Sequence, residues 1–395
     1  MIVKIFNAKI ITPYRVIPNG CILMENGIIK AVVSGNIETE DVQEINAHGN
    51  YVSPGFIDLH VHGGGGHDFM DNDLHGFLKI AQIHAKNGTT AMFPTTLSSE
   101  KEDLLETIAT YEKAALNNPF GASFLGLHLE GPYFAMNQRG AQDPRYIRDP
   151  DPEEYMDILS RTGVIKRWSA APELKGAIDF GRYLVSRGVL PALAHTDAIY
   201  EEVLEAFENG YTLATHLYSG MSGVTRRNAF RYAGVIESAF LIDGISVEVI
   251  ADGVHLPPPL LKLIYKIKGP GRIALITDAM RAAGMPPGES TLGSLKNGLK
   301  VIVEDGVAKL PDRSSFAGSV ATADLLVRNM VNLADVPLPD AVRMITQTPA
   351  QIMGVEDRKG TLSVGKDADI VIFDAQINIK STIIGGKIVY QEKEN

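Results

Sequence analysis

The middle of the chain alternates short apolar runs with amphipathic stretches, and this alternation constrains the fold more than any other feature. Eight apolar runs have the length of buried strands: Phe56–Val61, Thr89–Phe93, Ser123–Leu129, Ile165–Ala170, Val189–Ala194, Tyr211–Thr215, Ser246–Ile250 and Arg272–Thr277. The segments between most of them have helical spacing and the length of crossover helices. The pattern therefore predicts an α/β fold, a (β/α)₈ barrel of the TIM type.

The rival architecture is a doubly wound open sheet, which would prefer a glycine-rich phosphate turn after its first strand. Four glycines, Gly63 to Gly66, do follow the run that ends in His60-Val61-His62. Their spacing does not fit G-x-G-x-x-G followed by a helix. The barrel is therefore the favoured architecture.

Both ends of the chain have a different pattern, with short strand-like runs and turns. Asn26-Gly27, for example, is a hairpin signal. We expect residues 1–53 and 356–395 to form one small β-sandwich domain around a barrel of residues 54–355. Within the barrel, alternation around Glu304-Asp305-Gly306 predicts an inserted hairpin near residues 293–310.

Composition excludes several classes of function. A formal net charge of -10 argues against a nucleic-acid partner, which would require a basic face. The sequence contains no apolar run of about twenty residues, so we expect no membrane span. The strand-like start lacks a signal peptide, and a single cysteine, Cys21, excludes an internal disulfide. We therefore expect a soluble, cytoplasmic protein.

Six potential metal ligands fall at the C-terminal ends of predicted strands: His60, His62, Glu130, His195, His216 and Asp278. Residues two apart on a strand share a face, so His60 and His62 can reach one ion together. A lone histidine after a strand is more often a loop or core residue, and a lone aspartate is usually a helix cap. Six such residues at the face where barrel enzymes keep their chemistry together predict a metal site. His128 is expected to be structural.

Four imidazoles and two carboxylates suit borderline divalent metals, with zinc or iron favoured and manganese an alternative. Their number exceeds the needs of one tetrahedral zinc and suggests one or two ions per subunit, bridged by a carboxylate. Such a site activates water at neutral pH, and Asp278 is the candidate general acid/base. No Gly-x-Ser-x-Gly elbow is present, so hydrolysis without a protein nucleophile is expected.

Several motifs resemble a known family. The segment Pro54–Gly63 resembles the opening motif of the amidohydrolase superfamily. Within it, the chain resembles the N-acetylglucosamine-6-phosphate deacetylases in His128–Pro132 (His-Leu-Glu-Gly-Pro), Ala194–Thr196, Thr215–Tyr218, Ile250–His255 and Leu275–Ala279. The resemblance implies that Glu130, His195 and His216 hold one metal ion. It further implies that Glu130 bridges to a second ion near His60, His62 and Asp278.

The resemblance also implies substrate contacts. Arg227 and His255 match the family's phosphate-binding arginine and histidine, and the histidine is expected to reach a neighbouring subunit's site, which implies a homodimer. Arg226 and Arg231 compete for the role of the arginine, and Arg227 could instead be a solvated loop residue. Ser219-Gly220 replaces the usual Asn-Ala or Asn-Gly, and Arg227-Asn228-Ala229-Phe230-Arg231 stands where the family has Arg-Glu-Pro-Gly. Gln142, after Ala141, replaces a histidine that helps to hold the acetyl carbonyl. These departures affect the phosphate and the sugar, and leave the predicted metal ligands unchanged.

The expected function is metal-dependent hydrolysis of the N-acetyl amide of an amino sugar, most simply N-acetylglucosamine 6-phosphate. One alternative is deacetylation of a different or unphosphorylated amino sugar, or another amidohydrolase reaction. The other is a non-catalytic scaffold, which is disfavoured because such proteins typically lose the ligands that this chain retains.

Overall fold

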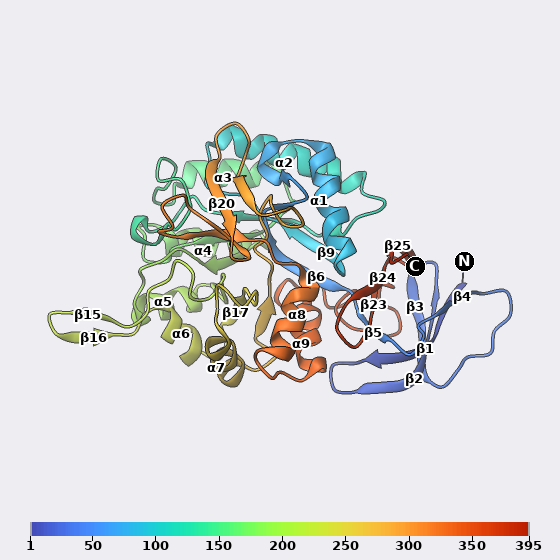
Figure 1. Ribbon diagram of the computed structural model, residues 1–395. Helices are drawn as coiled ribbons and strands as arrows, with labels where there is room; N and C mark the ends of the chain where they lie inside the picture. Colours follow the sequence, from blue (N-terminus) through green and yellow to red (C-terminus); the bar gives the residue numbers. More distant parts are fainter. Residues whose placement is uncertain (1, 394–395) are drawn as a thin grey trace.

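Both ends of the chain contribute to one large sheet. The computed structural model describes residues 2–393. Eight strands pair in the order β25-β24-β23-β5-β1-β2-β3, with β4 alongside β1, and Figure 1 shows them beside both termini. Their bounds are β1 Ile2–Ile11, β2 Val16–Glu25, β3 Ile28–Ser34, β4 Gln43–Asn46, β5 Tyr51–Pro54, β23 Ile370–Phe373, β24 Ile379–Ile384 and β25 Lys387–Gln391. The strand β23 joins the two ends by pairing antiparallel with β5.

The middle of the chain is α/β with parallel strands, as predicted. The strands are β6 Phe56–Val61, β9 Thr89–Pro94, β10 Ser123–Phe124, β11 Leu127–Glu130, β12 Ile165–Ala170, β13 Leu190–Leu193, β14 Leu213–Ala214, β17 Ser246–Val249 and β18 Ile273–Leu275. One parallel set runs β10-β9-β6 and a second runs β11-β12-β13-β14-β17-β18. Isolated parallel bridges join Thr95 to His128 and Val61 to Ala279, beside the ends of these two sets.

The third predicted strand is divided in two by Gly126. Its φ of +149° lies in a region that residues with a side chain rarely adopt. A Cβ added there would lie 2.2 Å from Lys166 Cγ, so a side chain would not fit. On either side of this glycine the pairing partner changes, because β10 pairs with β9 whereas β11 pairs with β12. The kink thereby places Glu130 at the tip of β11.

Helices follow most of the parallel strands, as crossovers require. Their bounds are α1 Leu74–Lys86, α2 Lys101–Leu116, α3 Pro152–Arg161, α4 Ala177–Ser186, α5 Tyr200–Glu208, α6 Val235–Leu241, α7 Pro258–Lys268, α8 Ala323–Asn332, α9 Leu338–Ile345 and α10 Gln347–Ile352. Short elements between β6 and β9, and after β11, are β7 Gly63–Gly64, β8 His67–Asp68, η1 Phe69–Asp71 and η2 Met136–Gln138. Within residues 2–393, none of the helices combines the length and the apolar character that crossing a bilayer requires.

The insertion after β18 is larger than the predicted hairpin of residues 293–310. It is a four-stranded antiparallel sheet of β19 Gly288–Leu292, β20 Leu299–Glu304, β21 Val307–Lys309 and β22 Phe316–Ser319. Its last strand returns to the parallel strands, where the Ser319 amide donates a 2.8 Å hydrogen bond to the Asp278 carbonyl. The prediction was too short because β19 and β22 are short and partly exposed, so their sequences carry little alternation.

A second hairpin projects from the body of the molecule (Figure 1). It consists of β15 Thr225–Arg227 and β16 Phe230–Tyr232, with Arg227 opposite Phe230 in the antiparallel register. The two turn residues, Asn228 and Ala229, both have positive φ, which suits a tight hairpin turn. Phe230 near its tip is 73% exposed.

The terminal sheet shares part of the main apolar core. Phe373 of β23 is fully buried and belongs to the same cluster of contacting side chains as Phe56 of β6. The centroid of the Phe373 ring lies 6.4 Å from the centroid of the Phe56 ring and 5.7 Å from that of the Tyr51 ring. This aromatic contact couples the terminal sheet to the first parallel strand.

Replacing Phe373 with alanine should therefore destabilise the protein strongly. We expect Phe373→Ala to lower the free energy of unfolding by about 3–5 kcal/mol, because the lost contacts leave a cavity. The matched control is Phe120→Ala, since Phe120 is 63% exposed. This substitution should change the free energy of unfolding by less than about 0.5 kcal/mol. Urea unfolding followed by circular dichroism measures both. Equal effects of the two substitutions would contradict the proposed coupling.

Candidate metal centre

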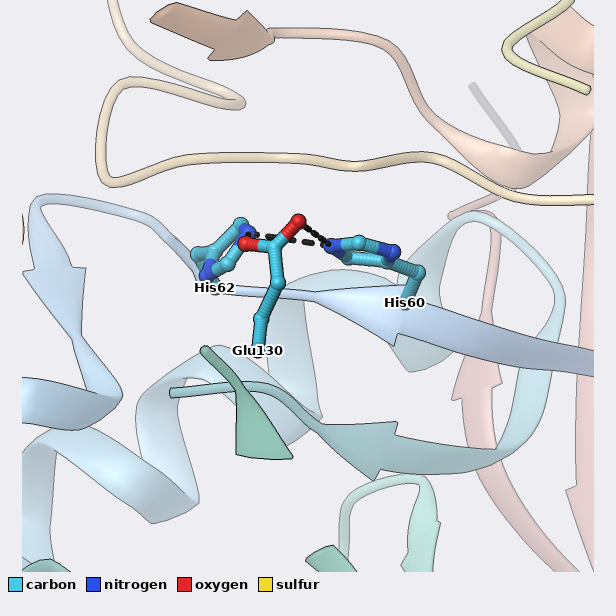
Figure 2. Close-up of side chains that lie close together, drawn as sticks. All are labelled: His60, His62 and Glu130. Carbon is cyan, nitrogen blue, oxygen red and sulfur yellow. Dashed lines mark hydrogen bonds and ion pairs between the residues drawn. The ribbon is translucent and has the colours of Figure 1, made fainter. Parts of the chain in front are cut away.

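The six predicted ligands lie together at one end of the parallel strands. His60 and His62 belong to or directly follow β6, and Glu130 ends β11. His195, His216 and Asp278 come shortly after β13, β14 and β18, respectively, and all six side chains are buried. Figure 2 shows His60 and His62 pointing from their strand toward Glu130. Strand ends far apart in the sequence thus converge on one small volume.

Glu130 is at the centre of this cluster. Its Oε1 lies 2.9 Å from His216 Nε2, 3.3 Å from His195 Nε2 and 3.5 Å from His60 Nε2. Its Oε2 lies 3.4 Å from His62 Nε2. Two sets of ligand atoms result, each compact enough for one ion, and Glu130 is common to both. We call His60, His62 and Glu130 the His60 group, and Glu130, His195 and His216 the His216 group.

The donor set fits a divalent cation. The Nε2 atoms of His60 and His62 lie 3.1 Å apart, a separation at which two lone pairs repel unless a proton or cation lies between them. Burial lowers the pKa of both rings, but Glu130 and Asp278 outweigh it and raise the pKa to about 9 for His60 and about 10 for His62. The pocket therefore favours added positive charge, and these groups could hold metal ions.

Asp278 lies beside the His60 group. Its Oδ1 is 3.2 Å from His62 Nε2 and 3.5 Å from His60 Nε2. Burial alone would raise the pKa of its carboxyl, but the charges of His60 and His62 outweigh this and hold the pKa below its usual value. Asp278 is therefore an ionised carboxylate that faces the cavity and can accept a proton.

Three of the six residues have left-handed backbone conformations, which non-glycine residues seldom adopt. The φ angles are +47° for His195, +31° for His216 and +47° for Asp278. Such conformations persist where the surrounding structure enforces them, and they concentrate at functional sites. For Asp278 the enforcing contact is a 2.9 Å hydrogen bond from its amide to the His60 carbonyl.

His195 is oriented by the loop that carries η2. Its Nδ1 lies 2.8 Å from the Gln138 carbonyl, so that nitrogen carries the hydrogen and Nε2 presents a lone pair toward Glu130. Gly220 lies against the same ring, and a Cβ at this position would be 2.8 Å from both His195 Nδ1 and Gln138 O. Gly220 also has a positive φ of +57°. A side chain there would displace His195.

A cavity of about 250 Å³ opens onto the cluster. Its wall includes the predicted substrate residues Ala141, Gln142, Ser219, Gly220 and His255. Gln142 donates a 2.9 Å hydrogen bond from Nε2 to Glu130 Oε2 and accepts one of 2.9 Å from the Ser98 amide. Gln142 therefore contacts the carboxylate that both groups share.

Of the two predicted phosphate-binding residues, His255 lines the cavity of its own chain and Arg227 does not. His255 lies in the wall of its own chain's cavity, where its Nδ1 is 2.6 Å from Asp252 Oδ2 and its ring packs on Phe316. The expectation that His255 reaches a neighbouring subunit's site stays a prediction, because the structure describes a single chain. Arg227 lies on the projecting hairpin, outside this wall, with its guanidinium 5.4 Å from the Tyr232 ring centroid. The motifs match the residue types but do not indicate the direction in which each loop points.

His128 has the structural position that was expected. Its Nε2 lies 2.7 Å from Ser169 Oγ and its Nδ1 lies 3.2 Å from Thr95 Oγ1, so both ring nitrogens are bonded to hydroxyl groups. Burial, with the nearby Arg167 charge, holds the pKa of its ring well below the usual value. His128 is therefore a neutral ring that packs beneath the ligands.

Several residues of the site are not among those predicted from the sequence. Tyr218 and Phe316 line the cavity, and Phe316 comes from the inserted sheet, where no sequence pattern identified it. Arg167 and Glu248 form an ion pair beneath the ligands, with both side chains fully buried. The sequence does contain an indication of this pair, because Arg167 and Glu248 each place a charge within a segment predicted to be a buried strand, and buried charges require partners.

Known proteins share this sequence and architecture. The model of the amidohydrolase family matches residues 51–389. N-acetylglucosamine-6-phosphate deacetylase from Bacillus subtilis (strain 168) is 33% identical over 390 residues, which cover 98% of this chain and 96% of the relative. The chain belongs to this family of amidohydrolases. The resemblance inferred from its motifs is thereby confirmed.

Solved structures of amidohydrolases from the same family have the same fold. N-acetylglucosamine-6-phosphate deacetylase from Pasteurella multocida superposes with a TM-score of 0.92 at 28% identity, covering 99% of this chain and 100% of that one. A mutant of the Mycobacterium smegmatis enzyme in complex with N-acetyl-D-glucosamine-6-phosphate superposes with a TM-score of 0.89 at 30% identity, covering 99% of each chain. The architecture is therefore that of an amidohydrolase over essentially the full length.

Loss of one imidazole should weaken metal binding. We expect His195→Ala to lower the affinity for metal by more than about tenfold, because the His216 group then has only two ligands. The control is His75→Ala, which removes an exposed histidine on α1. Elemental analysis after dialysis measures the metal-to-protein ratio. An unchanged ratio for His195→Ala would exclude His195 as a ligand.

Proposed function

We propose that this amidohydrolase cleaves the N-acetyl amide of N-acetylglucosamine 6-phosphate, giving glucosamine 6-phosphate and acetate. The family assignment makes the protein a hydrolase of the amino-sugar deacetylase type. The observation that carries the proposal is the buried cluster of four imidazoles around Glu130, with Asp278 ionised beside it. The relatives that bear this name match along nearly the whole chain, and one was solved with this substrate.

The proposed architecture behind this site is a closed (β/α)₈ barrel of residues 54–355 with a β-sandwich of residues 1–53 and 356–395. Two observations support closure of the barrel. The Thr95–His128 bridge lies between β9 and β11, and the Val61–Ala279 bridge lies between β6 and the end of β18. In a closed barrel the carboxyl ends of all the strands surround one site, as the cluster requires.

We further propose one or two divalent ions per subunit, with zinc or iron favoured over manganese. The His216 group would hold the first ion and the His60 group the second, with Glu130 shared between them. When bound, such ions polarise a carbonyl group and lower the pKa of water toward about 7. Imidazole and carboxylate ligands suit all three metals, so the ligand set itself does not select among them.

Asp278 would move the proton during hydrolysis. Its ionised carboxylate accepts a proton from the attacking water as the water oxygen bonds to the acetyl carbon. The same carboxyl then donates this proton to the amide nitrogen as the carbon–nitrogen bond breaks. The second proton of the water passes to the released amine, so acetate and the ammonium form of the amino sugar leave, and Asp278 returns to its ionised form. Neither a covalent intermediate with the protein nor a further reactant is required.

The substrate phosphate would lie near Ser219, Gly220 and His255, which line the cavity of the same chain. Arg227 is outside this wall, on an exposed hairpin that projects from the body. We therefore propose a homodimer in which Arg227 of one subunit reaches the cavity of the other. In this arrangement one phosphate-binding residue still comes from the neighbouring subunit, as expected from the sequence, but that residue is Arg227 and not His255.

The alternatives from the sequence remain predictions to be tested by assay. A different sugar epimer or an unphosphorylated sugar would use the same metal centre, because the departures concern Gln142, Ser219-Gly220 and Arg227-Asn228-Ala229, none of which is a predicted metal ligand. A non-catalytic scaffold is disfavoured because all six ligands are present and assembled. The cytoplasmic location also remains a prediction.

Removal of the Asp278 charge should abolish turnover without releasing metal. We expect Asp278→Asn to lower kcat by at least about 10²-fold, because the amide cannot accept the water proton. The measurement is acetate release from N-acetylglucosamine 6-phosphate, with metal content determined on the same sample. Near-full activity in Asp278→Asn would exclude the general acid/base role.

Arg227 should matter only for phosphorylated substrates. We expect Arg227→Ala to raise KM for N-acetylglucosamine 6-phosphate by about 10–100-fold, the effect of losing a charged hydrogen bond, and to leave the unphosphorylated sugar unaffected. The matched control is Arg231→Ala on the opposite strand of the hairpin, paired with Arg226. Including the galactosamine and mannosamine epimers in the assay identifies the sugar.

Mixed dimers distinguish the two ways of supplying Arg227. If Arg227 crosses to its partner, a dimer of one Arg227→Ala and one Asp278→Asn subunit contains one fully intact site. At substrate concentrations well below the KM of Arg227→Ala, both variants alone are poorly active. Mixing them should then restore up to about a quarter of the wild-type activity, since random pairing gives half mixed dimers with one intact site each. If no activity is recovered although mass spectrometry shows that the subunits have exchanged, Arg227 does not act in the partner's site. It then either acts in the site of its own subunit or does not contact the phosphate.

A further inference from the structure

A fully buried ion pair lies beneath the metal ligands, inside the parallel strands. Glu248 comes from the middle of β17 and Arg167 from β12, and neither side chain is exposed. Removing both charges from water carries a large desolvation penalty, and an apolar pair of similar volume is often at least as stable. A buried pair at this position therefore calls for a role other than stability.

The contacts of Glu248 indicate this role. Both carboxylate oxygens of Glu248 are bonded by Arg167, one of them at 2.9 Å from Nη2. The Oε2 atom also lies 3.4 Å from His60 Nδ1 and accepts a 3.2 Å hydrogen bond from the His216 amide. Arg167 is itself fixed, because Nη2 donates to Thr215 Oγ1 at 2.6 Å and Nη1 donates to the Leu59 carbonyl at 3.3 Å.

The pair determines which nitrogen of His60 is available. An ionised carboxylate can only accept hydrogen bonds, so the hydrogen of a neutral His60 ring resides on Nδ1. The Nε2 lone pair then points to Glu130, His62 and Asp278, at 3.1–3.5 Å. By contrast, the buried Nδ1 atoms of His62 and His216 have no hydrogen-bond partner among the described residues. Within the His60 group, this carboxylate contact is specific to His60.

We propose that Arg167 and Glu248 are positioning residues that hold His60 in the tautomer and orientation required for a metal ion in the His60 group. The proposal rests on the metal centre of the proposed function. Arg167 keeps Glu248 in place, and Glu248 in turn orients the ligand ring. A partner of this kind typically changes metal affinity when it is removed. The ion pair thus supports the occupancy of the second position.

The test is metal binding by Glu248→Gln, which keeps the side-chain shape and removes the charge. We expect metal affinity in the His60 group to fall by about 10–100-fold, with the His216 group retaining its ion. Titration of metal-free protein with Co²⁺, followed by its visible absorption, resolves the two binding steps. Elemental analysis after dialysis should show two ions per subunit in the wild type and close to one in the variant.

The matched control is Asp58→Asn. Asp58 is also a buried carboxylate, and it lies on the same strand as His60. Its side chain bonds to Thr277 and to backbone amides and does not contact an imidazole nitrogen. We expect Asp58→Asn to bind both ions normally. If both variants weaken both binding steps equally, the ion pair has only a structural role and the proposal is wrong.

Arg167→Lys provides a second variant if Glu248→Gln fails to fold. Lysine keeps the buried positive charge but loses the two-pronged contact that fixes Glu248. We expect weaker binding in the His60 group alone, and unchanged binding in both groups would overturn the proposal. Wild-type protein that binds a single ion through His195 and His216 would also overturn it. Wild-type protein that binds no metal would instead contradict the proposed function itself.

Discussion

The interaction on which the site depends is the contact of one carboxylate, Glu130, with four imidazole rings. A buried carboxylate is stable only when positive charge or hydrogen-bond donors compensate it. Here the surrounding rings do so, and they hold the pKa of Glu130 well below its usual value in spite of burial. A cluster of this composition favours cations, because each histidine can exchange a proton for a metal ion.

Much of the remaining structure serves to bring these groups together. Gly126 interrupts the third strand and changes its pairing partner, which leaves Glu130 at the strand tip. Left-handed backbone after two other strands turns His195 and His216 inward, and Gly220 leaves room for the His195 ring. The inserted sheet returns at Ser319 to bond the Asp278 carbonyl and closes one side of the cavity with Phe316.

Charge compensation extends below the ligands as well. Arg167 and Glu248 occupy the interior of the strands, where apolar side chains would ordinarily pack. His128 lies beside them as a neutral ring bonded to Ser169 and Thr95. Thr215 connects the two parts, because its Oγ1 accepts a hydrogen bond from Arg167 and lies 3.0 Å from Ser169 Oγ. Buried polar networks of this kind fix a specific arrangement when their members are paired. This polar layer lies between the apolar core and the cluster of imidazole rings around Glu130.

The sequence by itself determined most strand positions, the residues that gather at the ends of these strands and the family, because strand periodicity and short motifs are local properties of the chain. His60-Val61-His62 illustrates this, since alternation along one strand suffices to place both rings on the same face. Only the tertiary structure decided the partners of Arg167 and Glu248, the extent of the inserted sheet and the positions of Arg227 and His255. These depend on contacts between segments far apart in the sequence, such as the 3.4 Å contact between His60 Nδ1 and Glu248 Oε2, and no local pattern encodes where a loop points.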